Sequence, residues 1–347
     1  MLYVTTRNRW DTYTAQWALT KDTGPDGGLF VPMGFPQYDA AQIRTLADQS
    51  LYTTVAQVLN QFFSAKLTEQ DVRFAVGRTT VNLVTMSHRL VVAETWHNPA
   101  GEFSGTALKL CRRMCQPGTT VETVSDWANI AVQIAFLFGI FGQLLHMGVV
   151  DLEKPVDVAV TAGDFSSPMA VWYARKMGLP IHVVVCGCNE NGAPWELLHK
   201  GEFRTGVVAV KTTTPLADYA RPAGLERLIS AALGDNAVQA YVSACDKGAV
   251  YVPCEDEYEI LRKGMFASVA GNRRLDALVP NVYRTNSYVF GPYSALAYAG
   301  LMDYRTITGG NTTAILLAPR SPLLDEQWML RALDVPSDTL RERVKLS

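Results

Sequence analysis

The sequence has few charged residues and no excess of either sign. Only 18% of its 347 residues are Asp, Glu, Lys or Arg, and 31 basic against 33 acidic side chains give a net charge of −2. Proteins that bind nucleic acid or anionic membranes carry basic surfaces, which this composition does not supply. We therefore expect neither nucleic acid nor a membrane as a partner.

Cysteine and histidine are scarce, and they are not spaced as metal ligands. None of the six cysteines forms a CxxC pair, and no histidine stands near them at zinc spacing, so we expect no metal. Residues 1–11 contain no apolar segment of the kind found in secretion signals. Without such a signal, a disulfide framework is unexpected in a chain of this length. We expect a reduced, cytoplasmic protein.

One stretch, residues 127–150, contains no charged residue and is long enough to span a bilayer. It includes the polar residues Asn129, Gln133 and His146, and no Lys or Arg flanks it closely. A single span without flanking positive charge is a poor match to a membrane protein. The pattern instead predicts a helix that is buried in the protein core.

The rest of the chain alternates between short apolar strands and helical patterns. Hydrophobic residues make up 48% of the sequence, which is enough for a large core. Strands and helices that alternate in this way are typical of a parallel sheet with helices on both faces. We expect strands at 90–93, 157–160, 181–186 and 313–317, and helices at 40–63, 168–176, 225–233 and 254–263.

Two N-terminal motifs carry a family resemblance. The segments YVTTRN, residues 3–8, and GPDGGLFVP, residues 24–32, resemble the opening of the threonine synthases. The glycines permit the positive φ angles of a tight turn, and Leu29 and Phe30 are expected to dock onto the core. We interpret these residues as architecture rather than chemistry.

The resemblance continues over residues 94–104, ETWHNPAGEFS. Threonine synthases carry an ELFHGPTLAFK-like segment here, and its lysine forms a Schiff base with pyridoxal phosphate (PLP). Glu94, His97 and Phe103 agree with that segment, but Ser104 occupies the lysine position. Because a hydroxyl group cannot form an imine, the resemblance implies that PLP is not bound covalently at this position.

Residues 160–167, VTAGDFSS, resemble the threonine synthase loop whose backbone amides bind the phosphate of the cofactor. Gly163 and Phe165 keep the shape of that loop. Asp164 and Ser166 depart from it, and Asp164 places a carboxylate beside the phosphate position. We interpret Asp164 or Ser166 as the N-cap of the following helix.

A further match covers residues 317–322, LAPRSP. In the family, this segment supplies a hydroxyl group that hydrogen-bonds the pyridine nitrogen of the cofactor. Pro319 stands at that position, and proline offers neither a hydroxyl group nor an N–H. We expect the remnant cofactor residues to be non-functional for PLP, and they are Gly163, Asp164, Phe165, Ser166, Pro319 and Ser321.

The resemblance also implies a fold and its boundaries. Threonine synthases place a small cofactor subdomain after the lysine helix, and this subdomain is missing here between about 105 and 124. We expect an α/β protein with two domains. The first, over 1–88, is a mostly helical threonine synthase-like domain, and the second, over 89–347, is a reduced fold-type-II PLP-enzyme-like α/β domain with a mainly parallel sheet.

These losses lead to the prediction of a threonine synthase-like pseudoenzyme with a binding or assembly role and without a cofactor. We expect a small-molecule ligand in the remnant cleft. We also expect a homo-oligomer or a partner protein, because the loss of a subdomain exposes apolar surface.

Two catalytic alternatives remain open at this point. His97, Glu94 and Ser104 have the residue types of a nucleophilic triad, although His97 is also explained as a retained structural residue. The other alternative is a PLP-dependent threonine synthase-type lyase that acts on a phosphohomoserine-like substrate. It would use a non-standard lysine, such as Lys109, which lies five residues after Ser104.

Overall fold

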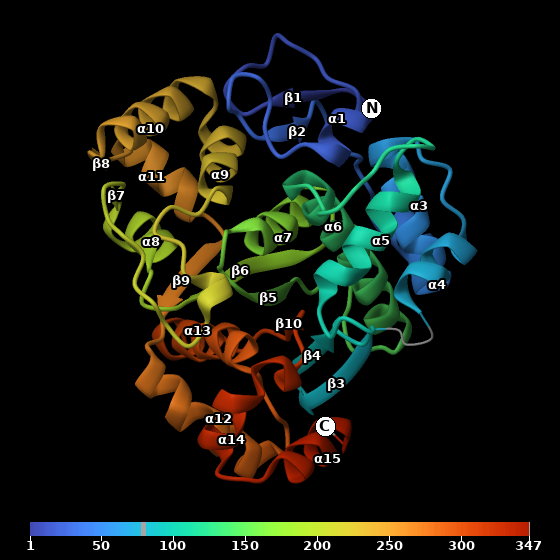
Figure 1. Cartoon of the computed structure of the whole chain (residues 1–347), viewed down its shortest axis with the longest axis vertical. Helices are drawn as coiled ribbons and strands as arrows, with labels where there is room; N and C mark the ends of the chain where they lie inside the picture. Colours follow the sequence, from blue (N-terminus) through green and yellow to red (C-terminus); the bar gives the residue numbers. More distant parts are fainter. Residues whose placement is uncertain (78–80, 347) are drawn as a thin grey trace.

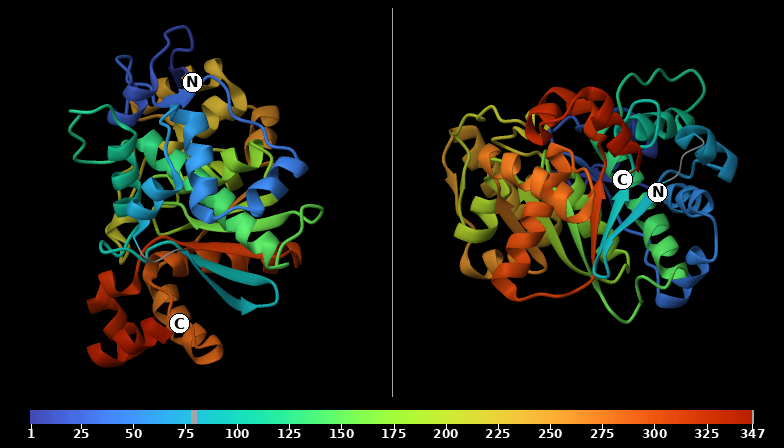
Figure 2. Two further views of the ribbon diagram at one scale, coloured as in Figure 1. Left: turned by 90° about the vertical axis from the view of Figure 1, so that its right-hand side faces the viewer. Right: turned by 90° about the horizontal axis from the view of Figure 1, so that it is seen from below.

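A computed structural model describes residues 1–77 and 81–346, which are built around a six-stranded sheet. In spatial order its strands are β3 (Asn82–Ser87), β4 (Leu90–Glu94), β10 (Ala314–Ala318), β5 (Val156–Thr161), β6 (Ile181–Cys188) and β9 (Met265–Val269). The strands from β4 to β9 are parallel. At the edge, β3 pairs antiparallel with β4 and forms the hairpin seen in Figure 2. The prediction of a mainly parallel sheet is confirmed.

Both faces of this sheet are buried, and β4 shows why. Successive side chains of a strand point to opposite faces. Val91 and Ala93 belong to a core that includes the N-terminal helices, whereas Leu90 and Val92 belong to a second core beneath the C-terminal helices. The sheet therefore lies between two helical layers, coloured mainly blue to green and orange to red in Figure 1.

The helices divide between these two cores. The first core receives α1 (Ala15–Thr20), α2 (Ala40–Ala47), α3 (Leu51–Phe63), α4 (Glu69–Val76), α5 (Phe103–Met114), α6 (Asp126–His146), α7 (Ser166–Lys176) and α9 (Gly224–Leu233). The second core receives α12 (Asn272–Asn286), α13 (Pro292–Thr308), α14 (Glu326–Leu333) and α15 (Ser337–Leu346). The first core also receives α8 (Ala193–Trp195), α10 (Asp235–Lys247) and α11 (Glu255–Arg262).

Two small antiparallel sheets flank the main one. The first joins β1 (Tyr3–Thr5) to β2 (Phe30–Pro32), and the second joins β7 (Phe203–Arg204) to β8 (Val250–Tyr251). In the loop before β2, Gly27 has a φ of +75°, as the turn chemistry predicted. Phe30 is fully buried, so its predicted docking onto the core is confirmed.

The charge-free segment forms α6, which is a core helix. Among the described residues it is the one helix whose length and composition would suit a bilayer, yet 78% of its apolar window is buried inside the protein. It packs between α3 on one side and α7 on another, and Trp127 in its first turn is completely buried. The prediction of a buried helix is confirmed.

The prediction of one helix over 40–63 is wrong, because the chain breaks there into α2 and α3. Asp48 ends α2, and Ser50 adopts an extended conformation as the N-cap of α3. The Ser50 hydroxyl accepts the N–H of Thr53 at 3.1 Å, which satisfies a backbone donor that a continuous helix would have paired differently. The break lets α3 turn and pack along α6.

Candidate functional site

A cleft of about 240 Å³ opens at the carboxyl ends of β5 and β10. Ligands of parallel α/β sheets bind at this edge, because the loops that leave the strands converge there. The lining combines the starts of α5 and α13, one side of α6 and the loops after β5 and β10. Four residues that the sequence analysis singled out as remnant cofactor positions line the cleft, and they are Ser104, Gly163, Asp164 and Pro319. The structure therefore brings together four positions that come from three separate motifs.

Ser104 lies near the start of α5 and is exposed in the cleft. Its hydroxyl donates a hydrogen bond of 2.8 Å to Glu102 Oε1. Glu102 Oε2 in turn accepts from Arg320 Nη1 at 2.7 Å, and Arg320 Nε donates to Asp325 at 3.1 Å. The guanidinium group also lies over the ring of Tyr293, 5.4 Å from its centroid. The position that the resemblance assigns to the lysine is thus linked through Glu102 and Arg320 to Asp325.

The loop before α7 departs from the predicted capping pattern. Phe165, not Asp164 or Ser166, is the N-cap residue, and it has a left-handed φ of 72°. The Asp164 carboxylate still accepts the Ser166 N–H at 2.9 Å, and its other oxygen lies 2.8 Å from the Ser166 hydroxyl. Asp164 can contact Ser166 in this way because the αL conformation of Phe165, which lies between them, turns the chain. The N-cap prediction is wrong by one residue, although Asp164 does pair with a helix amide.

The electrostatics of this loop are those of a desolvated acid. Burial raises the pKa of Asp164 above its usual value, and the nearby charge of Asp126 adds to that shift. The hydrogen bonds from Ser166 act in the opposite direction but do not cancel it. The ionised carboxylate is therefore less favourable in the folded protein than in the unfolded chain.

This shift predicts how stability depends on pH. A carboxyl group whose pKa is raised by folding stabilises the protein most below its unfolded value, here about 3.8, and loses that contribution as pH rises through the folded value. Asp164→Asn keeps an acceptor for the Ser166 N–H but does not ionise. We expect the variant to gain stability relative to the wild type as pH increases from 3.8 to neutrality. Urea denaturation over a pH series measures this, with Asp334→Asn at an exposed site as the matched control.

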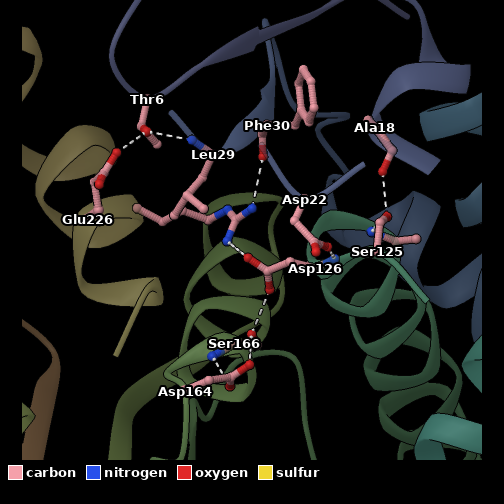
Figure 3. Close-up of polar contacts among 12 residues, drawn as sticks. Thr6, Ala18, Asp22, Leu29, Phe30, Ser125, Asp126, Asp164, Ser166 and Glu226 are labelled. Atoms are coloured by element: carbon pink, nitrogen blue, oxygen red, sulfur yellow. Dashed lines mark hydrogen bonds and ion pairs between the residues drawn. The ribbon is translucent and has the colours of Figure 1, made fainter. Parts of the chain in front are cut away.

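A buried ionic network lies directly behind this loop (Figure 3). The Ser166 hydroxyl lies 2.9 Å from Asp126 as well as 2.8 Å from Asp164, and its single proton can be donated to one of these carboxylates at a time. Asp126 also forms an ion pair with the fully buried Arg227 of α9. A second Arg227 nitrogen donates to the carbonyl of Phe30 at 3.2 Å. The network therefore joins the cleft loop, α6, α9 and the N-terminal GPDGGLFVP loop.

A second set of polar contacts joins the N-terminal YVTTRN motif to α9. Glu226 accepts from the Thr6 hydroxyl and forms a salt bridge of 2.8 Å with Arg7. Sequence reasoning missed Asp126, Glu226 and Arg227, because none of the motifs contains them. Thr6 is fully buried in the structure and so needs a hydrogen-bond partner, but the sequence alone does not identify Glu226 as that partner.

His97 and Glu94 do meet, but not beside Ser104. Glu94 is buried at the end of β4 and accepts hydrogen bonds from His97 Nε2 at 2.7 Å and from the Tyr288 hydroxyl at 2.7 Å. Burial raises the pKa of Tyr288 well above its usual value. His97 lines a separate cavity of about 540 Å³, together with Ser321, whereas Ser104 lines the cleft. In the described residues the predicted triad is therefore not assembled.

The other candidate residues are also placed. Lys109 is exposed on α5, and five residues along a helix put it about 140° around the axis from Ser104. Pro319 follows β10 and lines the cleft. Ser321 is buried outside the cleft, where its hydroxyl accepts the Leu323 N–H at 3.3 Å and caps a short 3₁₀ helix.

The segment that the family resemblance marks as shortened is a plain connection. Residues 115–125 link α5 to α6 and contain no helix or strand. The connection is held by Arg112, whose Nε donates to the Val121 carbonyl at 2.7 Å, and by the N-cap Ser125 of α6. Ser125 also donates to the carbonyl of Ala18 at 2.6 Å, so the connection is tied to α1.

Comparison with known sequences agrees with the motifs. Residues 2–79 match the family model described as threonine synthase N terminus. Human threonine synthase-like 1 is 24% identical over 186 residues, which cover 52% of this chain and 25% of that protein. Threonine synthase of Methylobacillus glycogenes is 31% identical over 117 residues, which cover 33% of this chain and 24% of that protein. The matched part spans about a quarter of the length of these relatives.

Comparison with solved structures extends the likeness to the whole chain. PLP-bound threonine synthase from Brucella melitensis superposes with a TM-score of 0.85 at 20% identity, over 99% of this chain and 94% of that chain. Threonine synthase from yeast gives 0.82 at 17% identity, over 97% and 90%. The fold is that of the fold-type-II PLP enzymes. Residues 2–79 are similar in sequence to the N-terminal part of the threonine synthases, and the fold of the whole chain is similar to theirs.

The residues of the cleft do not fit PLP as this class holds it. No lysine lines the cleft within the described residues, and Ser104, which has no amine, is hydrogen-bonded to Glu102. At the start of α7, where an anion would sit, the chain supplies its own carboxylate from Asp164. Pro319 cannot donate or accept a side-chain hydrogen bond. We therefore assign no chemical step in this cleft to that cofactor.

Proposed function

We propose that the chain is a non-catalytic threonine synthase-like protein that binds a small molecule in its cleft without covalent PLP. The proposal rests on the residues at two positions that contact the cofactor in the threonine synthases, Ser104 and Asp164. Ser104 cannot form an imine, and the Asp164 carboxylate takes up an amide that a phosphate would need. The scaffold around them is intact, with a buried core on each face of the sheet.

The competing function is a PLP-dependent lyase that uses Lys109. Its placement does not support this, because Lys109 is exposed on α5 and is absent from the lining of the cleft. We expect purified protein, supplied with PLP and phosphohomoserine, to release inorganic phosphate at the rate of a protein-free blank. An intact threonine synthase serves as the positive control.

The contrary result is equally specific. Release of phosphate that Lys109→Ala abolishes, and that Lys154→Ala at an exposed site leaves unchanged, would replace the pseudoenzyme with the lyase.

We also propose that the protein self-associates in the cytoplasm. All six cysteines have free thiols, which suits a reducing compartment. The segment after β7 exposes Val207, Val208 and Val210, and Val208 is 88% exposed. Apolar side chains gathered in this way mark protein interfaces more often than free surface. Sedimentation velocity should detect a homo-oligomer, and a single monomeric species at all concentrations would contradict this part of the proposal.

A further inference from the structure

The start of α7 has few groups left with which to hold an anion. A helix N-terminus binds anions through the free N–H groups of its first turn. Of the first three residues of α7, Ser166 gives its N–H to the Asp164 carboxylate and Pro168 has no N–H. Only the N–H of Ser167 is left in this set. At the start of α7, where free N–H groups would bind an anion, the protein therefore places the Asp164 carboxylate.

The charges that line the cleft have a negative balance. Glu102 and Asp164 are acidic, and Arg320 is the one cation among the described lining residues. Arg320 is already paired with Glu102 at 2.7 Å and with Asp325 at 3.1 Å. Its charge is thus neutralised within the chain, whereas the Asp164 carboxylate accepts the Ser166 N–H and forms no direct ion pair with a described residue. A ligand that enters the cleft meets an excess of negative charge.

The cleft also holds polar groups that the protein itself does not use. The side chains of Asn129, Gln133, Ser167 and Tyr219 line it and form no hydrogen bond with any described residue. Amides and hydroxyls of this kind orient a bound molecule through donors and acceptors. Beside them lies an apolar recess of about 40 Å³ whose walls include Phe136, Leu137 and Ile140. The recess shares Phe103 and Gln133 with the cleft and has room for a short alkyl group.

We propose that the cleft binds a small, non-phosphorylated amine, with its ammonium group toward Asp164 and its alkyl part in the recess. This inference rests on the proposed function and adds the class of ligand. Asp164 is the residue that determines specificity. Its carboxylate accepts the Ser166 N–H, which is then not free to bind an anion, and its negative charge favours a cationic group at the start of α7. A phosphate monoester of the same size is repelled from that position.

The test compares two probes that share one alkyl chain, butylammonium and butyl phosphate. Their dissociation constants are measured by NMR titration of the full chain at neutral pH. We expect the ammonium probe to bind about tenfold or more tightly than the phosphate, which corresponds to one close charge contact in a partly solvated site. Asp164→Asn should reduce that preference by about tenfold, by weakening the amine and strengthening the phosphate. Asp334→Asn, the same change on the exposed surface, should leave it unaltered.

The outcomes separate this inference from the proposed function. Equal or tighter binding of butyl phosphate, a preference that Asp164→Asn leaves unchanged, or binding of neither probe would each overturn the amine site. A non-covalent phosphate binder would still be a protein without covalent PLP. A PLP adduct on a lysine would refute the proposed function, whichever probe is preferred.

Discussion

Replacing Arg227 with methionine is expected to lower the free energy of unfolding by about 3–5 kcal/mol, because removal of one partner of a buried ion pair leaves the other charge uncompensated. The Arg227 side chain is 0% exposed, and its ion pair with Asp126 lies behind the cleft loop. The variant also frees the Phe30 carbonyl, which Arg227 binds at 3.2 Å. Chemical denaturation of both proteins measures the difference.

A matched control separates burial from charge. Arg262 forms an ion pair of 3.2 Å with Glu259 on the surface of α11, and both side chains are more than half exposed. Arg262→Met should cost about 0–1 kcal/mol, as exposed pairs usually do. Equal losses for the two variants would show that the Asp126–Arg227 pair does not hold the N-terminal loop, α6 and α9 together.

The second large effect concerns the two cofactor positions. The double variant Ser104→Lys with Asp164→Asn is expected to gain covalent PLP binding, because it supplies an amine and removes the carboxylate from the phosphate side. Ser104→Lys alone should bind PLP about tenfold more weakly than the double variant, since the Asp164 carboxylate still opposes the phosphate. Intact mass after borohydride reduction, with peptide mapping to position 104, measures both.

The control for this experiment uses the same two changes at another place. Ser337→Lys at the start of α15, combined with Asp334→Asn, provides an unrelated pair that lies outside the cleft. This control should form no mapped adduct. If the cleft pair behaves like the control pair, the two positions do not form one site.

Much of the fold was predictable because its signals are local. Strands such as β5 and β10 are short apolar runs, and α6 is a long one, so their burial follows from the sequence. The break between α2 and α3 was missed because the apolar period continues across it, while Ser50 acts only through its capping bond. β9 was also missed. Its five residues, Met265–Val269, carry a weak pattern, and the strand is defined by its pairing with β6.

The site was predictable only in part, for a similar reason. Ser104, Asp164 and Pro319 stood out because each replaces a family residue within a recognisable motif. Their partners did not stand out. Arg320 and Arg227 neutralise acids that are far away in the sequence, and only the fold brings those charges together. Long-range ion pairs leave no periodic trace in a single sequence, so the charge balance of the cleft required the structure.

The most direct measurement is the mass of the wild-type protein after saturation with PLP and reduction by borohydride. Because the cleft offers no lysine and presents the Asp164 carboxylate, we predict an unmodified mass for folded, soluble protein. A stoichiometric adduct that maps to one lysine would contradict the proposal and would identify an active PLP enzyme.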